Sequence, residues 1–237
     1  MTNLLISTPE LTTVLKQVED DEEDENDEPD EEVYGIISLI DLRQSAKTSC
    51  SESLRKFIIE HASKSKNEKF EEAARSALTG KSALVVNERF INLPARISLP
   101  CFESLVQDLK KKPHLDFDHF FMIIKVQKAM EEKTSSSKKK GDVKRQKVDR
   151  SAKNQTGAAD DAAGILFQNP EEEIFCEKAE QWMEFSVANQ CDEEVRSGNW
   201  DEEDVKYRPF RRILLLSSER FLAAIAQLEH EFSGPAS

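Results

Sequence analysis

The sequence is poor in the residues that build disulfide-bonded or zinc-binding proteins. Its 237 residues include four cysteines, Cys50, Cys101, Cys176 and Cys191, and no two of them form a C-x-x-C pair. Three of the four lie in or beside apolar patterns, where a free cysteine commonly acts as a small buried hydrophobe. The spacing therefore predicts neither a disulfide framework nor a metal site.

Long apolar runs are also missing. The chain has no stretch of 18 apolar residues, so we expect no membrane-spanning helix and no membrane partner. The N-terminal segment, residues 1–15, has neither a basic flank nor a continuous apolar run, a pattern that does not fit a secretory signal peptide.

Motifs of catalysis are absent as well. Gly80-Lys81-Ser82 is similar to the end of a phosphate-binding loop, but Arg75 occupies the earlier glycine position and a strand, not a helix, is expected to follow. None of the seven glycines stands in a G-x-G/A segment between a strand and a helix, the setting in which GCN-related acetyltransferases bind coenzyme A. His114 and His119 lie near aspartates in an unpatterned loop, which favours a solvated turn over metal ligation. We therefore expect no catalytic residue and no cofactor, and we expect that the protein is not an enzyme.

Charge is what the sequence has in excess. The formal net charge is −13, and charged residues make up 33% of the chain. An acidic protein repels phosphate and attracts basic partners, which argues against indiscriminate nucleic-acid binding by the whole surface, and we expect no specific nucleic acid as a partner. Residues 19–32 hold 12 carboxylates in 14 positions, Glu22, Glu23 and Asp24 among them, and such a block should be disordered. It acts either as a solubilising loop between two strands or as an electrostatic bait for a basic partner.

A second polar insertion is basic. Residues 131–161 show no periodicity, and residues 138–150 hold seven cations against two carboxylates. The cations that an import receptor would read there are Lys138, Lys139, Lys140, Lys144, Arg145 and Lys147. We favour a nuclear localisation signal, with shuttling to the cytoplasm left open; a soluble linker and nonspecific contact with RNA are the alternatives.

Hydrophobic periodicity predicts about six strands interleaved with five helices. Strands are expected at residues 12–18, 33–42, 84–86, 118–130, 183–187 and 212–216. Helices are expected at residues 51–62, 67–78, 98–109, 169–179 and 218–232. Their expected N-caps are Ser51, Asn67, Ser98, Asn169 and either Ser217 or Ser218. We expect Gly80 to end the second helix and Leu222 to lie on the apolar side of the last. This alternation predicts an α/β (α+β) fold with a single mixed sheet flanked by helices, in one domain spanning residues 1–237 with two disordered insertions.

The central stretch, residues 83–100, joins a buried strand to an amphipathic helix through a loop punctuated by Pro94 and Pro100. We expect Glu88, Arg89 and Asn92 in this loop, among the apolar Phe90, Ile91 and Leu93. The residues that we single out as a candidate partner-binding surface are Glu88, Arg89, Phe90, Asn92 and Pro94, together with Glu22, Glu23 and Asp24. Packing of strand on helix is the alternative interpretation of the loop.

Several landmarks in order resemble the BCCIP family of eukaryotic nuclear proteins. They are the acidic block, Val33-Tyr34-Gly35-Ile36-Ile37-Ser38-Leu39, Asn87-Glu88-Arg89-Phe90-Ile91-Asn92-Leu93-Pro94, the lysine-rich segment, residues 171–179 and Gly198-Asn199-Trp200. The resemblance runs from about Thr12 to Phe232, and Glu-Arg-Phe-Ile-Asn is its most specific part. Family members carry a further N-terminal segment before the position that matches Leu11, whereas ten residues precede it here, so the resemblance implies a shortened N-terminus or a missing sheet edge.

The resemblance also implies a fold similar to an acetyltransferase without its cofactor site, and a set of partners. One is a basic large-subunit ribosomal protein, for which the protein would be a chaperone. The others, implied by animal members, are a cyclin-dependent-kinase inhibitor and a recombination mediator, for which it would be a cell-cycle and DNA-repair adaptor. We expect the escort function first and the adaptor second.

Overall fold

The computed structural model describes residues 11–16, 32–43, 48–129, 164–188, 195–196 and 206–232. Both predicted insertions lie outside these ranges except for Glu32, and so do Gly198, Asn199 and Trp200. The α-helices are α2 (Ser49–Lys64), α3 (Glu68–Thr79), α4 (Ser98–Lys111), α5 (Glu172–Lys178) and α6 (Ser218–Phe232). The strands are β1 (Thr12–Lys16), β2 (Val33–Asp41), β3 (Ser82–Arg89), β4 (His119–Ala129), β5 (Ile165–Phe167), β6 (Gln181–Ser186), β7 (Val195–Arg196) and β8 (Lys206–Ser217).

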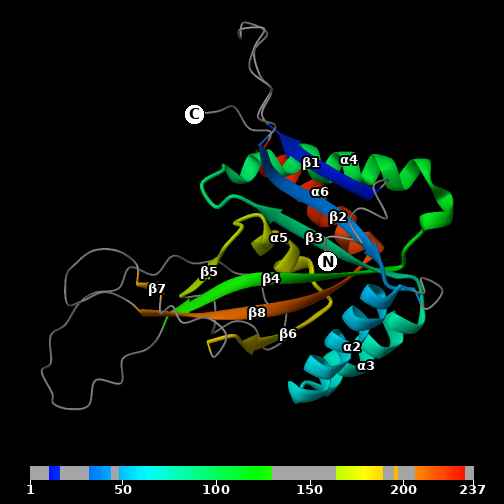
Figure 1. The fold of residues 1–237 in the computed structure, drawn as a ribbon, viewed down its shortest axis with the longest axis vertical. Coiled ribbons are helices and arrows are strands. Elements are labelled where there is room, and N and C mark those ends of the chain that lie inside the picture. Colours follow the sequence, from blue (N-terminus) through cyan, green and yellow to red (C-terminus); the bar gives the residue numbers. More distant parts are fainter. Residues whose placement is uncertain are drawn as a thin grey trace, which may run out of the picture.

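All of these strands belong to one mixed sheet of eight strands. Its main path runs β1-β2-β3-β4-β8-β6, with β5 added beside β4 and β7 beside β8. β3 and β4 are parallel, and the other described pairs are antiparallel. The predicted mixed sheet flanked by helices is therefore confirmed (Figure 1). A single domain over the whole chain stays a prediction.

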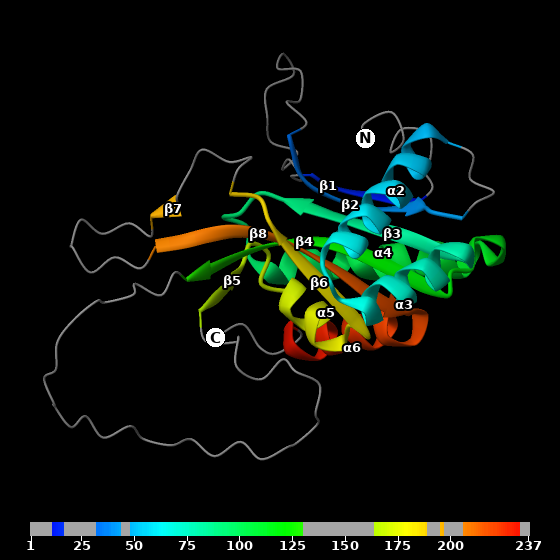
Figure 2. The same cartoon turned by 90° about the horizontal axis from the view of Figure 1, so that it is seen from below.

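Helices cover the two faces of the sheet unequally (Figure 2). The three-helix face packs on α4, α5 and α6, where Phe120 of β4 stacks on Phe221 with ring centroids 4.3 Å apart. The two-helix face packs on α2 and α3, where Ile58 and Phe70 are fully buried with Phe121 of β4. Sheet residues alternate between the two cores because successive side chains of a strand point to opposite faces.

The predicted helices are all present, but several of their predicted ends are wrong. Asn67 is confirmed as a cap, since its Oδ1 accepts a hydrogen bond from the Phe70 amide at 3.1 Å, and Gly80 ends α3 as expected. Ser51 lies inside α2, which Thr48 caps by accepting from the Ser51 amide at 3.2 Å. Ser98 is no cap either, because a 3₁₀ turn at Ala95–Ile97 runs into α4 and the Ser98 hydroxyl donates to the Ala95 carbonyl instead.

Three further predictions need correction. The α5 helix begins at Glu172, so Asn169 precedes the helix and does not cap it. Leu222 is 44% exposed on α6 and does not join the core. Glu88 and Arg89 belong to β3 and not to a loop, because their backbones pair with β2 opposite Ile36 and Gly35.

Within the part of the chain that the structure describes, no helix is long and apolar enough to cross a bilayer.

Candidate partner-binding site

The parallel strands β3 and β4 separate halfway along the sheet. They pair only where Ser82–Val85 faces His119–Met122. Beyond that point β3 stays beside β2 up to Arg89, while β4 continues beside β8 and gains β5 on its other edge. The segment that leads into α5 enters here, and the Gln168 amide donates to the Lys125 carbonyl at 3.0 Å. Segments distant in sequence therefore meet where the two strands diverge.

Buried polar side chains join this segment to the end of β3. The Arg89 guanidinium forms two parallel hydrogen bonds with the Glu171 carboxylate, Nη2 to Oε2 at 2.8 Å and Nε to Oε1 at 3.1 Å. Both side chains are buried, with 3% and 0% of their surfaces exposed. Such a fork-to-fork pair is among the strongest and most directional interactions of a protein. It locks α5 to β3.

The same cluster contains a second carboxyl group, that of Glu172. Its Oε1 accepts from the Asn169 amide at 2.9 Å and from the Asn87 amide at 3.3 Å. Burial, followed by the nearby carboxylates of Glu171 and Glu88, raises the pKa of Glu172 to about 8, although the two amides oppose the shift. At neutral pH the carboxyl is therefore mostly protonated, and Glu171 is the one that pairs with Arg89.

Arg89 also shapes the loop that follows β3. Its Nη1 donates to the Leu93 carbonyl at 2.6 Å, and the Phe90 amide donates to the Tyr34 carbonyl at 3.0 Å. Gly35 lies opposite Arg89 in the ladder, and a Cβ added there would stand only 3.0 Å from the Arg89 Cβ. Glycine at position 35 thus leaves the room that the Arg89 side chain needs.

The loop presents apolar side chains to solvent. Ile91 is 71% exposed, Phe90 54% and Val33 49%. The Tyr34 ring meets the Phe90 ring edge to face, with centroids 5.9 Å apart at 79°. We call the four residues Val33, Tyr34, Phe90 and Ile91 the apolar tip. Hydrogen bonds from Arg89 to the Leu93 carbonyl and from the Phe90 amide to the Tyr34 carbonyl hold its base.

The acidic block is attached to the molecule beside the apolar tip. β1 ends at Lys16 and β2 begins at Val33, so residues 17–32 join the two strands. The start of β2 lies next to the end of β3, because the two strands are antiparallel. A hydrogen bond to the Glu32 carboxylate raises the pKa of the Tyr34 phenol. The last carboxylate of the block is therefore in contact with the tip.

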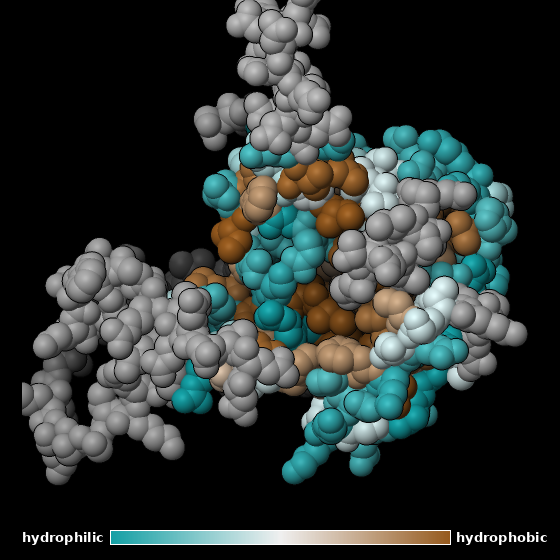
Figure 3. Space-filling model, in the orientation of Figure 1, coloured by the Kyte–Doolittle hydropathy of each residue, from teal (hydrophilic) through white to brown (hydrophobic). Residues whose placement is uncertain are grey.

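Apolar side chains also continue from the tip across the two-helix face. The ladder places Val14, Ile36 and Val86 on that face, where Val86 packs against the core and Val14 is 42% exposed. Figure 3 shows apolar residues gathered in the hollow of this face, with polar residues around them. Glu88 and Lys125 form an ion pair here, at the separation of β3 from β4. The exposed apolar area is thus bordered by charge.

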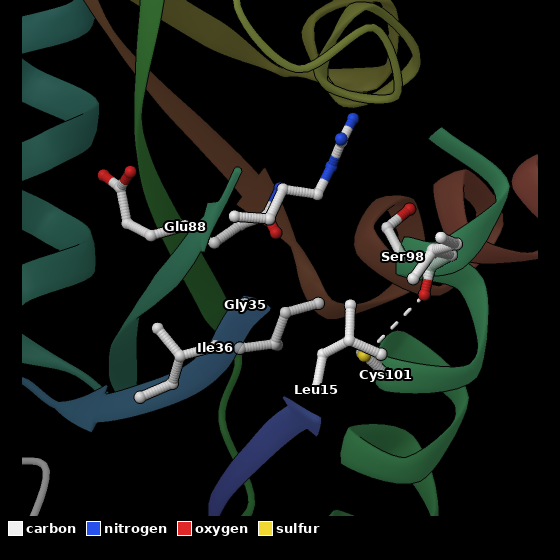
Figure 4. A pocket seen from close by; sticks show the side chains of 10 residues that line it. Leu15, Gly35, Ile36, Glu88, Ser98 and Cys101 are labelled. Atoms are coloured by element: carbon white, nitrogen blue, oxygen red, sulfur yellow. Dashed lines mark hydrogen bonds between the residues drawn. The ribbon is translucent and has the colours of Figure 1, made fainter. Parts of the chain in front are cut away.

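A small hollow lies on the opposite side of β2, between the sheet and α4. Leu15, Ile37, Ile97 and Cys101 contribute to its lining. Figure 4 shows Leu15, Ser98 and Cys101 around it, with Glu88 turned away. Burial raises the pKa of the Cys101 thiol, so the thiol stays neutral. The hollow is apolar and offers no charged group free to bind a ligand among the residues described.

The structure separates the candidate residues that the sequence grouped together. Phe90, Asn92 and Pro94 are exposed in the loop and Glu88 is exposed on β3, whereas Arg89 is an internal clamp. A partner-binding role for these residues stays a prediction. The candidates that lie outside the described residues are Glu22, Glu23, Asp24, Lys138, Lys139, Lys140, Lys144, Arg145 and Lys147.

Sequence reasoning missed the clamp partners Asn87, Asn169, Glu171 and Glu172. The signal available was weak. Asn87 and Arg89 stand two residues apart, which puts them on one face of a strand, but nothing in the sequence indicates that the carboxylates at 171 and 172 would meet them. In the part of the chain that the structure describes, no cluster of His, Cys, Asp and Glu could hold a metal ion.

Comparison with known proteins gives consistent matches. A model of the BCCIP family matches residues 1–175. The mouse "BRCA2 and CDKN1A-interacting protein" is 27% identical over 98% of this chain and 70% of its own length. The "Protein BCCIP homolog" of Xenopus laevis is 31% identical over 93% of this chain and 68% of its own length. The crystal structure of BCP1 from Saccharomyces cerevisiae superposes with a TM-score of 0.51 at 16% identity, over 98% of this chain and 72% of that one, which shows a shared fold.

Proposed function

Because the chain belongs to the BCCIP family, we propose that it is a non-enzymatic nuclear protein that escorts a basic large-subunit ribosomal protein during ribosome biogenesis and nuclear transport. The observation that carries the proposal is the attachment of a block with 12 carboxylates directly beside an exposed apolar tip. The two features offer a basic, partly apolar client both charge and contact area.

The client that we propose carries lysines and arginines intended for RNA, before any RNA is present to neutralise them. Carboxylates of residues 19–32 attract such a surface and raise the rate of encounter, most strongly at low salt. They also screen the client from nonspecific contact with nucleic acid. The net charge of −13 acts in the same direction over the whole molecule.

A binding role also agrees with the filling of the gap between β3 and β4. Residues 168–172 occupy it, and their polar groups bond to β3 and β4. A coenzyme would need free backbone amides there, of the kind that a G-x-G/A segment supplies. The name of the mouse relative describes interactions with other proteins.

Nuclear import forms part of the proposal. The cations of residues 138–150 are the segment that an import receptor would recognise. An escort that enters and leaves the nucleus with its client needs such an address. Shuttling to the cytoplasm follows from that role.

A second function is favoured by the names of the relatives. The mouse protein is called an interactor of BRCA2 and of CDKN1A. By analogy, this chain could act as an adaptor for a recombination mediator or a cell-cycle inhibitor. It would bind a peptide by strand addition or in a groove. Binding of that kind depends on apolar and backbone contacts and responds little to salt.

Affinity purification of the tagged chain from nuclear extract, with mass spectrometry of stoichiometric partners, separates the two functions. We expect a single ribosomal protein without the rest of its subunit. Binding of that purified client is then compared for the wild type and for a variant whose residues 19–32 are replaced by an uncharged linker of equal length. The variant should associate more slowly at low salt and show a smaller salt dependence.

The matched control carries E68Q and E72Q, two exposed carboxylates on α3, away from the apolar tip. This control should associate nearly as fast as the wild type. Unchanged client affinity after removal of the acidic block would exclude electrostatic steering. Recovery of cell-cycle or repair proteins without a ribosomal protein would favour the adaptor.

A further inference from the structure

We infer that the apolar tip is the anchor of the client complex, and that the client surface it fits carries apolar side chains beside its lysines and arginines. The inference rests on the proposed escort function and specifies its contact. It assigns two tasks to two neighbouring parts of the molecule. The acidic block sets how fast the client arrives, and the apolar tip sets how slowly it leaves.

Exposure is the first argument. Single apolar side chains on a surface are normal, but here Val33, Phe90 and Ile91 are each about half exposed or more and come from two adjacent chain segments. The Tyr34 ring packs against the Phe90 ring, so side chains from β2 and from the loop after β3 meet there. Aromatic residues of this kind dominate the energy of protein interfaces because they bury much area with few rotatable bonds.

Rigidity is the second argument. The Arg89 guanidinium bonds the Leu93 carbonyl and the buried Glu171 carboxylate at the same time, so it holds both ends of the loop against α5. A surface that is already fixed loses little conformational entropy on binding. A buried ion pair is a costly way to stabilise a fold, but it places the loop in one defined position.

The third argument is charge, which indicates the kind of partner that binds the apolar tip. Glu32, the last carboxylate of the acidic block, contacts Tyr34; Glu88 is exposed on β3 two residues before Phe90, but its charge is paired with Lys125. A second copy of this chain would bring another −13 charges and a second acidic block to the contact. Repulsion between like charges disfavours that pairing. A basic polypeptide with apolar side chains is complementary to both the patch and its border.

Two synthetic peptides of equal length and equal lysine content test the inference with the full-length chain. In one the remaining positions are glycine and serine, and in the other some of the serines are leucine or phenylalanine. We expect the wild type to release the apolar peptide about tenfold more slowly than the polar one, since dissociation carries most affinity differences between related complexes. Association should be fast and salt-dependent for both peptides.

The variant F90S/I91S should lose the difference in dissociation rate while keeping fast association. L222S is the matched control, because Leu222 is an exposed leucine on α6, outside the patch. It should behave as the wild type. Thermal melting of the three proteins shows whether each is folded, and surface positions of this kind should change the midpoint little.

The outcomes separate the two proposals. Equal dissociation of the two peptides from the wild type, or an unchanged preference in F90S/I91S, overturns the anchor while salt-dependent binding still supports the escort. Failure of both peptides to bind at low salt overturns the escort and the anchor together. A preference lost in F90S/I91S and retained in L222S establishes the anchor.

Discussion

The two halves of β3 belong to one strand but are stabilised by different kinds of interaction. Residues Ser82–Val85 lie between β2 and β4 with helices on both faces, and their side chains are buried. From Asn87 to Arg89 the strand pairs only with β2, and its inward side chains are an amide and a guanidinium. The first half is held by apolar packing, and the second half by a few directional polar contacts.

The difference shows how this molecule fixes a loop at the edge of its core. Apolar packing tolerates many combinations of side chains of suitable volume. A buried ion pair tolerates almost none, because removing one partner leaves the other charged and unsolvated. The polar half of β3 is therefore suited to hold the apolar tip in one position, whereas an apolar contact there would leave the loop free to shift.

Arg89→Ala, in the polar half of β3, should cause the largest loss of stability that we expect. It leaves the Glu171 carboxylate buried without its cation, which costs about 3–5 kcal/mol of unfolding free energy. It also removes the bond to the Leu93 carbonyl, so the amides of Phe90 and Leu93 should lose protection from hydrogen exchange. Urea denaturation and exchange measured by NMR check the two effects.

Leu84→Ala is the control in the apolar half, where the side chain is 2% exposed. Its cavity should cost about 2–5 kcal/mol, a similar loss of stability. The amides of the loop should nevertheless keep their protection relative to the rest of the protein. Equal loss of loop protection in both variants would show that the clamp has no local role. The double variant R89M/E171Q should regain part of the stability lost in R89A.

The same division explains what the sequence could predict. The apolar half, β2, β4 and the helices follow from hydrophobic periodicity, and the resemblance to the BCCIP family is confirmed. The local sequence predicts a loop at Arg89, because a charged side chain after a short apolar run normally marks the end of a buried strand. Its burial depends on Glu171, which lies 82 residues away, and local patterns carry no information on such a partner.

Some predicted helix ends are wrong for a related reason. A serine or an asparagine before an apolar run predicts a cap from local sequence alone. In this fold the Ser51 hydroxyl donates to the Asp41 carbonyl of β2, and the Asn169 amide donates to Glu172. The local pattern assigns both side chains to capping, but a contact with β2 takes up the Ser51 hydroxyl, and a side-chain contact three residues away takes up the Asn169 amide.

The pH dependence of stability should reveal the second carboxyl group of the polar half. Burial raises the pKa of Glu172 from 4.5 to about 8, so the folded protein holds a proton that the unfolded chain releases. Its stabilising effect is complete below pH 4.5 and falls as the pH rises to about 8. The slope should approach roughly 1 kcal/mol per pH unit in that window.

Glu172→Gln keeps the shape of the side chain without its titration and should flatten the curve. Urea denaturation of the two proteins at several pH values between 5 and 8 measures the difference, in which the contribution of the four histidines cancels. We expect the variant to be the more stable protein at the alkaline end. Parallel curves for the two proteins would mean that Glu172 is ionised in the folded state.

Glu88→Gln should have the smallest effect, although Glu88 is the direct neighbour of Arg89. Its carboxylate lies on the other face of the sheet, 48% exposed, and pairs with Lys125, which is 29% exposed. Solvent screens such a pair, so its loss should cost about 0–1 kcal/mol, and less at high salt. Lys125→Met provides the reciprocal variant.

A larger effect of Glu88→Gln than of Arg89→Ala would contradict the division between the two faces of β3. One coupling between the faces is nevertheless expected. The Glu88 charge helps to raise the pKa of Glu172, so Glu88→Gln should lower that pKa slightly. The pH-dependent fall in stability should then end at a lower pH in Glu88→Gln than in the wild type. That shift is a direct measure of how far a charge on the open face is felt by the buried clamp, because no hydrogen bond between Glu88 and Glu172 exists among the described contacts to carry it.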